Sequence, residues 1–539
     1  MSSSLTRPSD PKHGTAGIGA SLTKAFFSLS TIAVCTKIFG FGEKLVVAHF
    51  FGTDQNADVY FGVTGIVLSL IWLVKELIYP SLLPVFAETL RKAPVQSGLL
   101  YRRTLLLVAV LLAILAVLVL VGAGPIIRIL VPGFSGPKRQ MATRLFGLLA
   151  PALFFLGMMM VTSTVLNAHR RFVRAALPEA ALKLLVVVSL ILLIPYIGMD
   201  ALALALGAGG LACLVVHLLL IPESRALVHP GDAGGSCPGF HKMLLLMGPL
   251  VVGIVFSHLN GLVDNLLAST LPTGQLSYLG YAKKLIDALL LVGPVALVTV
   301  VYPQLSYLAS DRHHPEFRQW VARVLRLMLC LSVPFGCILV GLHEPIVRVL
   351  FQRGHFDAVS MTGTSRAFLV YALGLPVFSL EALLVHAFFA LSDTKTPVKL
   401  GILCSLFDIA LALALLQPLE YLGIAWAFLA ARTAKVVVLT ILLHGRLGGI
   451  LGWELFGFSA KLALSGLLTW CMLGSLRGKL PSDARQLHVA FWCLLLPAVV
   501  AALVFAISSY LLKIEEFRMV VDLCRRRKTA IVTGCAELK

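Results

Sequence analysis

The stretch LLLVAVLLAILAVLVL, residues 105–120, contains only apolar side chains. Such a run predicts a helix that crosses the hydrocarbon core of a membrane, which takes about 20 apolar residues. Lipid offers the backbone no water to bond, so only helices and closed barrels satisfy its polar groups there. Because the run is continuous rather than alternating, it indicates a helix and not a barrel strand. A second run of similar character covers residues 489–512.

The whole chain has the composition of a membrane protein. Of its 539 residues 58% are hydrophobic and 13% charged, whereas a soluble domain averages about 45–50% apolar and about 25% charged residues. The sequence therefore predicts an all-α, polytopic integral membrane protein with about fourteen spans. The predicted spans are 24–50, 57–86, 104–131, 141–166, 176–196, 201–221, 243–267, 276–305, 321–342, 366–391, 398–416, 421–444, 456–473 and 488–512. The first, second and eighth contain Gly, Pro or charge, and we expect them to be bent or to line a cavity.

Lysine and arginine concentrate in every other connection, starting with the N-terminal segment. By the positive-inside rule, both termini are predicted to face the cytoplasm. The net charge of +19 follows largely from this bias and from the cluster RRRK at 525–528. Beside a span, such a cluster indicates a topology signal or a lipid anchor rather than a nucleic-acid site. The first twenty residues lack a signal-peptide pattern, and the ten Cys form no C-x-x-C motif that would indicate a metal or disulfide site.

A weak internal repeat suggests two lobes. Tyr79-Pro80 closes the second predicted span, and Tyr302-Pro303 closes the eighth, each followed by x-Leu. Transporters commonly contain duplicated halves, so we predict six spans per half. The predicted organisation is a polar tail at 1–20, an N-lobe at 21–221, a linker at 222–242, a C-lobe at 243–445, two further spans at 446–512 and a basic tail at 513–539.

Charged residues within predicted spans are the main candidates for function, since a charge in lipid costs at least a few kcal/mol unless it faces water, a partner or a substrate. The cations are Lys37, Lys44, Lys75, Lys283 and Lys284; the acids near them are Glu43, Asp58, Glu76 and Asp287. One interpretation is that these residues form internal ion pairs, as the spacing of Lys284 and Asp287 allows. The excess of lysine favours a cationic cavity that binds an anionic substrate.

A second set of charges contains Asp264 in the seventh span, Asp408 in the eleventh, and Arg432 and Lys435 in the twelfth. Two acids and two bases predict a neutral structural network. The alternative is a cation or proton site that couples transport to an ion gradient. The i,i+4 spacing of Glu179 and Lys183 in the fifth span predicts a local ion pair.

The sequence contains none of the short motifs typical of enzymes or of ATP-driven motors. It has no H-E-x-x-H, no G-x-x-x-x-G-K-[ST] and no G-x-S-x-G. A secondary transporter without a resident cofactor, and not an enzyme, is the remaining prediction.

Several blocks resemble the MurJ (MviN) family, lipid II flippases of the multidrug/oligosaccharidyl-lipid/polysaccharide exporter superfamily. The blocks are TKIFGF at 36–41, FG at 51–52 with ADVYF at 57–61, SYLGYAKKL at 277–285, EPIVRVLFQRG at 344–354 and DTKTPVK at 393–399. At two positions where the family has a substrate-facing arginine, this chain has Lys37 and Lys284. A second span-one arginine falls at Glu43, and the aspartate beside the span-eight arginine falls at Lys283.

The resemblance implies a two-lobed, fourteen-helix flippase of a bacterial inner membrane. Its substrate would be the undecaprenyl-diphosphate-linked disaccharide-pentapeptide of peptidoglycan, moved by alternating access to the periplasmic leaflet. Membrane lipids and cell-wall synthesis proteins would be its partners. A sodium site would lie near Asp264 and Asp408, where Arg432 could replace the ion with a fixed charge; the membrane potential is the other driving force that the resemblance allows. Three alternatives remain open: a flippase for another polyprenyl-linked oligosaccharide, such as an exopolysaccharide or O-antigen unit; a small-molecule exporter; and a scaffold that has lost transport.

Overall fold

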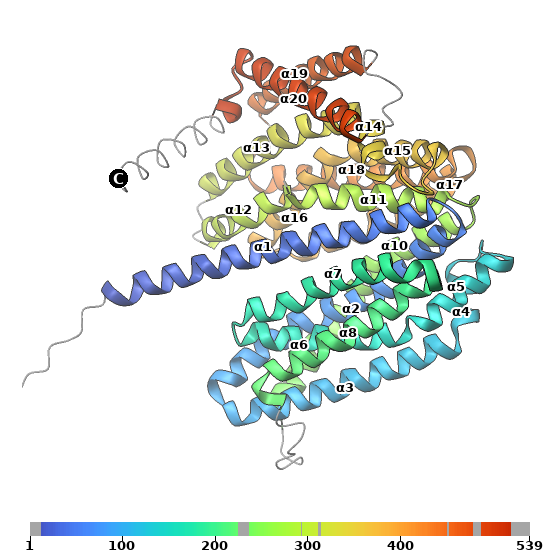
Figure 1. Ribbon diagram of the computed structural model, residues 1–539. Helices are drawn as coiled ribbons and strands as arrows, with labels where there is room; N and C mark the ends of the chain where they lie inside the picture. Colours follow the sequence, from blue (N-terminus) through green and yellow to red (C-terminus); the bar gives the residue numbers. More distant parts are fainter. Residues whose placement is uncertain are drawn as a thin grey trace, which may run out of the picture. The chain divides into compact units, whose positions relative to one another are not determined.

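The computed structural model describes residues 12–224, 237–292, 294–310, 314–449, 452–477 and 487–518. Within these ranges all regular elements are helices (Figure 1). Ten of the described helices are long and apolar enough to cross a membrane, or eleven if one bent pair counts as a single span. The predicted polytopic all-α class is therefore confirmed. The basic cluster at 525–528 and most of the predicted linker lie outside the described residues.

The first half of the chain contains eight α-helices and one short 3-10 helix. They are α1 (Lys12–Phe51), α2 (Gln55–Lys92), α3 (Pro94–Val121), α4 (Ala123–Leu130), α5 (Gly136–Leu148), α6 (Ala150–Ala168), α7 (Phe172–Ile197), α8 (Asp200–Leu220) and η1 (Pro222–Ser224). The predicted span 104–131 is divided between α3 and α4, and the span 141–166 between α5 and α6.

The second half contains the remaining eleven α-helices. They are α10 (Pro238–Ser269), α11 (Gln275–Val292), α12 (Pro294–Ser310), α13 (His314–Gly341), α14 (His343–Phe351), α15 (Ala358–Leu373), α16 (Leu375–Ala390), α17 (Lys395–Leu419), α18 (Tyr421–Arg446), α19 (Trp453–Arg477) and α20 (Leu487–Leu511). The predicted span 366–391 is a bent pair, with α15 and α16 meeting at 44°. Each of the fourteen predicted spans corresponds to one helix or to two consecutive helices.

Contacts divide the chain into two compact units. The first unit comprises residues 1–46, 63–129 and 139–255; the second comprises 47–62, 130–138 and 256–539. The end of α1, the start of α2 and the connection after α4 thus belong with the second half of the chain. The boundaries predicted for the lobes assigned these segments to the N-lobe, and that division stays a prediction.

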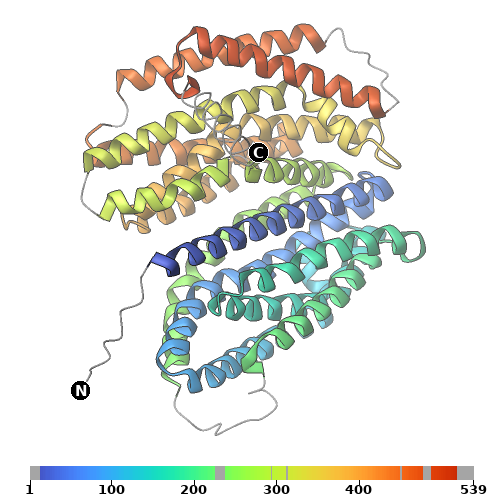
Figure 2. The ribbon, with the colours of Figure 1, turned by 60° about the vertical axis from the view of Figure 1, so that its left-hand side comes forward.

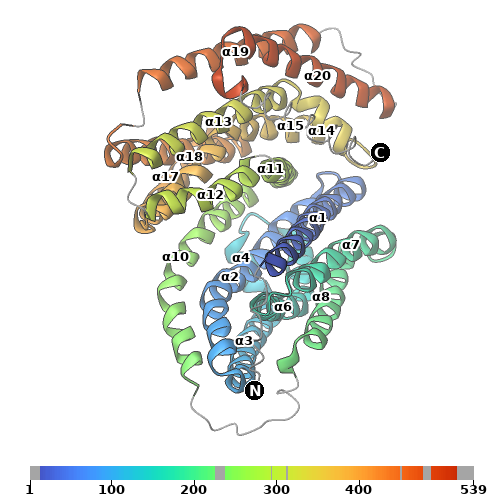
Figure 3. The ribbon, with the colours of Figure 1, turned by 90° about the vertical axis from the view of Figure 1, so that its left-hand side faces the viewer.

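The first unit is built around α6, which contacts α3, α7 and α8 (Figure 3). Its core includes Leu82, Phe86 and Val161, which are 0% exposed. The outward face of α3 is apolar as well: Val110 and Val117 are 56% and 58% exposed. A lipid environment accommodates such a face, whereas in water it would be an aggregation hazard.

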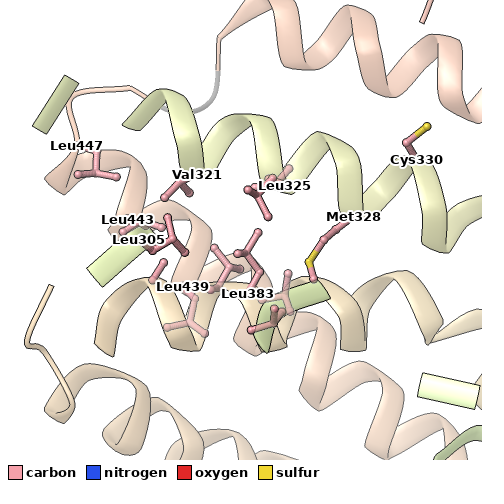
Figure 4. Close-up of a cluster of buried hydrophobic side chains, with 14 of the residues drawn as sticks. Leu305, Val321, Leu325, Met328, Cys330, Leu383, Leu439, Leu443 and Leu447 are labelled. Carbon is pink, nitrogen blue, oxygen red and sulfur yellow. The ribbon is translucent and has the colours of Figure 1, made fainter. Parts of the chain in front are cut away.

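The second unit has its largest described core between α12, α13, α16 and α18 (Figure 4). Leu305, Val321, Leu383, Leu439 and Leu443 meet there and are 0% exposed. α19 contacts both α13 and α20, which places the last two helices on the outside of this bundle (Figure 2).

The order of helices repeats along the chain. A long helix, a break and a short helix occur as α3–α4 and again as α13–α14, and the short helices carry the related sequences PIIR at 125–128 and PIVR at 345–348. The turns repeat too: Gly198, before α8, has φ 58° and ψ −137°, and Glu420, before α18, has φ 49° and ψ −131°. This repetition supports the six-span repeat suggested by Tyr79-Pro80 and Tyr302-Pro303.

Candidate functional site

Asp58 is the centre of a buried polar cluster in the second unit. Asp54 accepts hydrogen bonds from the backbone N–H groups of Asn56 and Ala57, 2.8 and 3.0 Å away, and so starts α2 just before Asp58. Asp58 is 1% exposed. Its carboxylate is paired with the Lys138 ammonium at 2.7 Å, so a buried charge is matched by a buried countercharge.

The same carboxylate caps the start of α11. Asp58 accepts hydrogen bonds from the backbone N–H of Gly274 at 2.8 Å and of Ser277 at 3.0 Å, and from the Ser277 hydroxyl. First-turn amides lack partners within their own helix, and the helix dipole favours an anion beside them. Asp58 and Ser277 open equivalent helices of the two repeats. The Asp58 cluster, defined as Asp58, Lys138, Gly274 and Ser277, therefore ties α2 to α11.

Further contacts surround the Asp58 cluster within the second unit. The Tyr281 hydroxyl donates to the carbonyl of Gly52 at 2.9 Å, and the hydroxyls of Thr53 and Ser360 lie 2.7 Å apart. A Cβ on Gly52 would lie 2.3 Å from the carbonyl oxygen of His355. Only glycine permits this close approach of the two connections, and its φ of +53° also favours glycine.

Lys44 and Glu43, on α1, are both buried. The Lys44 ammonium lies 2.8 Å from Glu43, and Lys183 of α7 lies 3.6 Å from the same carboxylate. Lys183 was expected to pair with Glu179 on its own helix; the structure pairs it with Glu43 instead, because packing of α7 brings it within reach of α1. Lys37, two turns earlier on α1, is exposed.

The predicted charges of α2 and α11 have different surroundings. The Lys75 ammonium lies over the Trp72 ring, 4.6 Å from its centroid, which is a cation–π contact. Glu76 is exposed on the same helix. Lys284 lies 3.6 Å from Asp287, so the predicted i,i+3 pair is confirmed. Its neighbour Lys283 lies 3.8 Å from Asp264 of α10.

The second predicted set of charges is arranged differently from the expectation. Asp408, 2% exposed, accepts a hydrogen bond from Asn260 at 2.6 Å. Arg432 and Lys435 both bind Glu381 of α16, at 2.6 and 2.8 Å, rather than either aspartate. Asp264, Asp408, Arg432 and Lys435 are thus not a closed network, because Glu381 takes both bases.

Sequence reasoning missed Glu381 and Lys138. Glu381 is the one acid in the apolar stretch 366–391, and that isolated charge was a usable signal. Lys138 lies in the first turn of α5, between two predicted spans, where nothing in the sequence distinguishes it from its polar neighbours. Among the described residues, no group of three or more His, Cys, Asp or Glu side chains is arranged to hold a metal ion.

The second unit also contains a pocket of about 420 Å³. Its walls include the aromatic rings of Tyr371, Phe378 and Phe428 together with Lys283, Arg432 and Lys435. It lies between α11, α15, α16 and α18.

A family model described as lipid II flippase MurJ matches residues 47–513. The chain belongs to the MurJ family. The probable lipid II flippase MurJ of Vibrio cholerae serotype O1 is 28% identical over 481 residues, which cover 86% of this chain and 90% of that protein. The lipid II flippase MurJ of Burkholderia cenocepacia is 25% identical over 480 residues, covering 84% and 90%.

Solved structures show that the fold is the MurJ fold. A lipid II flippase MurJ in an inward closed conformation superposes with a TM-score of 0.77 at 21% identity, covering 92% of this chain and 99% of that one. An inward-facing multidrug resistance MATE family transporter of the MOP superfamily superposes with a TM-score of 0.67 at 12% identity, covering 77% of this chain and 95% of that one. The roles of the lysines and of the Glu381 pairings in substrate binding stay predictions.

Proposed function

We propose that this chain is a lipid II flippase, a transporter with no reaction to catalyse. It carries undecaprenyl-diphosphate-linked peptidoglycan precursor from the cytoplasmic to the periplasmic leaflet of a bacterial inner membrane. The observation that carries the proposal is the match to the MurJ family over residues 47–513. The charges support it, since cations kept within apolar helices need a role that offsets their cost in lipid.

In this proposal the diphosphate is bound by Lys37, Lys44, Lys75, Lys283 and Lys284, helped by the acids that orient them. Asp58, Glu43, Glu76 and Asp287 are those supporting acids. A lysine ammonium binds phosphate as a point charge, without the two-pronged geometry of arginine. Lys37 has no acidic partner among the described residues, and Lys284 is exposed beside Asp287. These two are the best candidates for direct contact.

The Asp58 cluster joins the first turns of α2 and α11 within the second unit. The connections that surround the cluster are predicted to face the periplasm. We therefore propose that the cluster holds the start of α2 in place on that side of the second unit.

Coupling to a cation is a further part of the proposal. The Oδ1 atoms of Asp408 and Asn260 are buried and have no hydrogen-bond partner among the described residues. With Asp264, they would supply the oxygen ligands that a sodium ion prefers. Sodium bound there would neutralise the acids; Lys283, 3.8 Å from Asp264, would compete with it. If the Lys283 ammonium neutralises the acids in place of sodium, the membrane potential alone would drive transport.

The test is growth rescue of a bacterium depleted of its own MurJ. The wild-type chain is expected to restore growth. Lys37→Ala and Lys284→Ala are expected to lower rescue by about tenfold or more, since a hydrogen bond to a charged group contributes roughly 1.5–3 kcal/mol. Lys461→Ala, which removes an exposed lysine of α19, is the control and should rescue fully. Repeating the assay at low sodium tests the coupling ion.

Failure of the wild-type chain to rescue, despite normal amounts in the membrane, would contradict the lipid II proposal. Rescue of a strain lacking an exopolysaccharide or O-antigen flippase would then favour the alternative substrate, another polyprenyl-linked oligosaccharide. Full rescue by both lysine variants would be compatible with the flippase proposal. It would show that Lys37 and Lys284 do not bind the substrate.

A further inference from the structure

The pocket between α11, α15, α16 and α18 combines apolar walls with three cations. Arg432 and Lys435 project into it from α18, and Lys283 from α11. Phe428 forms a platform for two of them: the Lys283 ammonium and the Arg432 guanidinium lie 4.9 and 5.0 Å from its ring centroid. Contact with the ring fixes where these flexible cations lie.

The charged side chains that line the pocket, apart from His386, carry one more positive than negative charge: Lys283, Arg432 and Lys435 face Asp287 and Glu381. Glu381 Oε1 lies 2.6 Å from Arg432 and 2.8 Å from Lys435, so one acid serves two bases. Lys283 is matched by Asp264, and Asp287, on the wall, is matched by Lys284. Among the lining side chains the excess therefore resides on the Arg432–Lys435–Glu381 group; Asp408, which accepts a hydrogen bond from Asn260, does not line the pocket.

His386, on the same wall, has its Nδ1 2.7 Å from the carbonyl oxygen of Ala382 and donates a hydrogen bond to it. The remaining wall is apolar or aromatic, with Ile286, Leu290 and Phe378. The pocket thus suits a group that carries one negative charge on a partly apolar body.

We propose that this pocket binds a carboxylate of the transported substrate, on the peptide part of the lipid-linked precursor. This inference rests on the proposed function, because it names the part of the cargo that the pocket would recognise. A single surplus charge matches a carboxylate, whereas a diphosphate carries more charge than the pocket can balance. The volume, about 420 Å³, is within the range of small-molecule sites, roughly 300–1,000 Å³. Arg432 supplies the planar donor pair that carboxylates accept.

The test is calorimetry on the full-length protein in detergent micelles, with racemic N-acetyl-alanyl-alanine as the probe. Its C-terminal amide and inorganic pyrophosphate are the comparison ligands. The acid is expected to bind about tenfold or more tightly than the amide, which lacks the charge that the guanidinium and ammonium recognise. Pyrophosphate is expected to bind this pocket more weakly than the acid.

Three variants separate binding from structure. Lys435→Gln removes the surplus charge while Arg432 still pairs with Glu381, and is expected to weaken acid binding about fivefold or more. Glu381→Gln removes a negative charge, which adds to the surplus of positive charge, and is expected to tighten binding of the acid. Lys461→Gln removes an exposed lysine of α19 and should leave binding unchanged. Thermal unfolding of each variant reports its fold separately.

Equal affinity for acid and amide would overturn the proposal. Weaker binding in Glu381→Gln, matched by a lower unfolding temperature, would also overturn it, because a purely structural network predicts that result. If Glu381→Gln fails to fold, unchanged binding in folded Lys435→Gln rejects the proposal and weakened binding supports it. Rescue of growth by the wild-type chain without acid binding would reject this pocket alone; acid binding without rescue would reject the flippase proposal alone.

Discussion

Asp58 receives hydrogen bonds from the Lys138 ammonium, the amides of Gly274 and Ser277, and the Ser277 hydroxyl. A carboxylate that is 1% exposed has lost its hydration, and these donors replace it. Lys138 is similarly enclosed, so each of the two charges depends on the other. Removal of one partner leaves a buried charge without compensation, which costs more than the pair contributes.

Asp58→Asn is therefore expected to lower the free energy of unfolding by about 3 kcal/mol. The measurement is the midpoint of thermal unfolding in detergent, read from intrinsic fluorescence. Asp54→Asn is the matched control, because Asp54 is exposed and asparagine caps a helix about as well as aspartate. Combining Asp58→Asn with Lys138→Met should recover part of the loss. Equal effects of the two aspartate substitutions would show that the buried pair is not the source of the stability.

At the scale of elements, the turns before α8 and α18 show how one backbone shape is kept with different residues. Gly198 and Glu420 share positive φ near 50–60° with ψ near −130°, a region that is essentially restricted to glycine. A Cβ on Gly198 would meet nothing within 4 Å. Any penalty for a side chain there arises from the backbone alone. Glu420 adopts the same backbone conformation despite this penalty. Its carboxylate accepts a hydrogen bond from Gln275.

Gly198→Ala is expected to lower the free energy of unfolding by roughly 1–3 kcal/mol, the usual cost of such a backbone conformation. Glu420→Gly is expected to raise the free energy of unfolding, but by a smaller amount than Gly198→Ala lowers it. The gain is smaller because the substitution also removes the hydrogen-bond acceptor of Gln275. Gly474→Ala, in α19 and equally free of neighbours, is the control and should be neutral or stabilising. The readout is thermal unfolding in detergent. Unchanged stability of Gly198→Ala would show that this turn relaxes without cost.

At the scale of the whole molecule, the repeat and the charge bias together predict an orientation. The connections near Asp58, at 52–54, 131–135, 270–274 and 352–357, follow odd-numbered spans. The connections at 169–171 and 391–394 follow even-numbered ones. With a cytoplasmic N-terminus the first group faces the periplasm, and the arginines at 170 and 171 lie on the cytoplasmic side, as the positive-inside rule requires.

Reporter fusions test this orientation. Alkaline phosphatase fused after Ser135 is expected to be active, because the enzyme folds only outside the cytoplasm; fused after Arg171 it is expected to be inactive. Green fluorescent protein at the C-terminus of the full chain should fluoresce. The reverse pattern at both phosphatase sites would invert the topology and place the Asp58 cluster on the cytoplasmic side.

The sequence by itself determined the helices. Run length and apolarity are local properties, and lipid admits few alternatives to a helix, so all fourteen predicted spans correspond to one or two described helices. The pairing of Lys284 with Asp287 was equally local, being three residues apart on one helix. The breaks within α3–α4 and α5–α6 were not foreseen, because a break needs only one residue of irregular backbone within an apolar stretch.

Only the tertiary structure decided the partners of the buried charges. Lys183 lies four residues after Glu179 yet pairs with Glu43, and Arg432 and Lys435 pair with Glu381 on another helix. Asp58 binds Lys138 and residues more than 200 positions away. Periodicity tells which face of a helix carries a charge, but the identity of its partner depends on which helices pack together and at what register. That information resides in long-range packing and not in any local pattern.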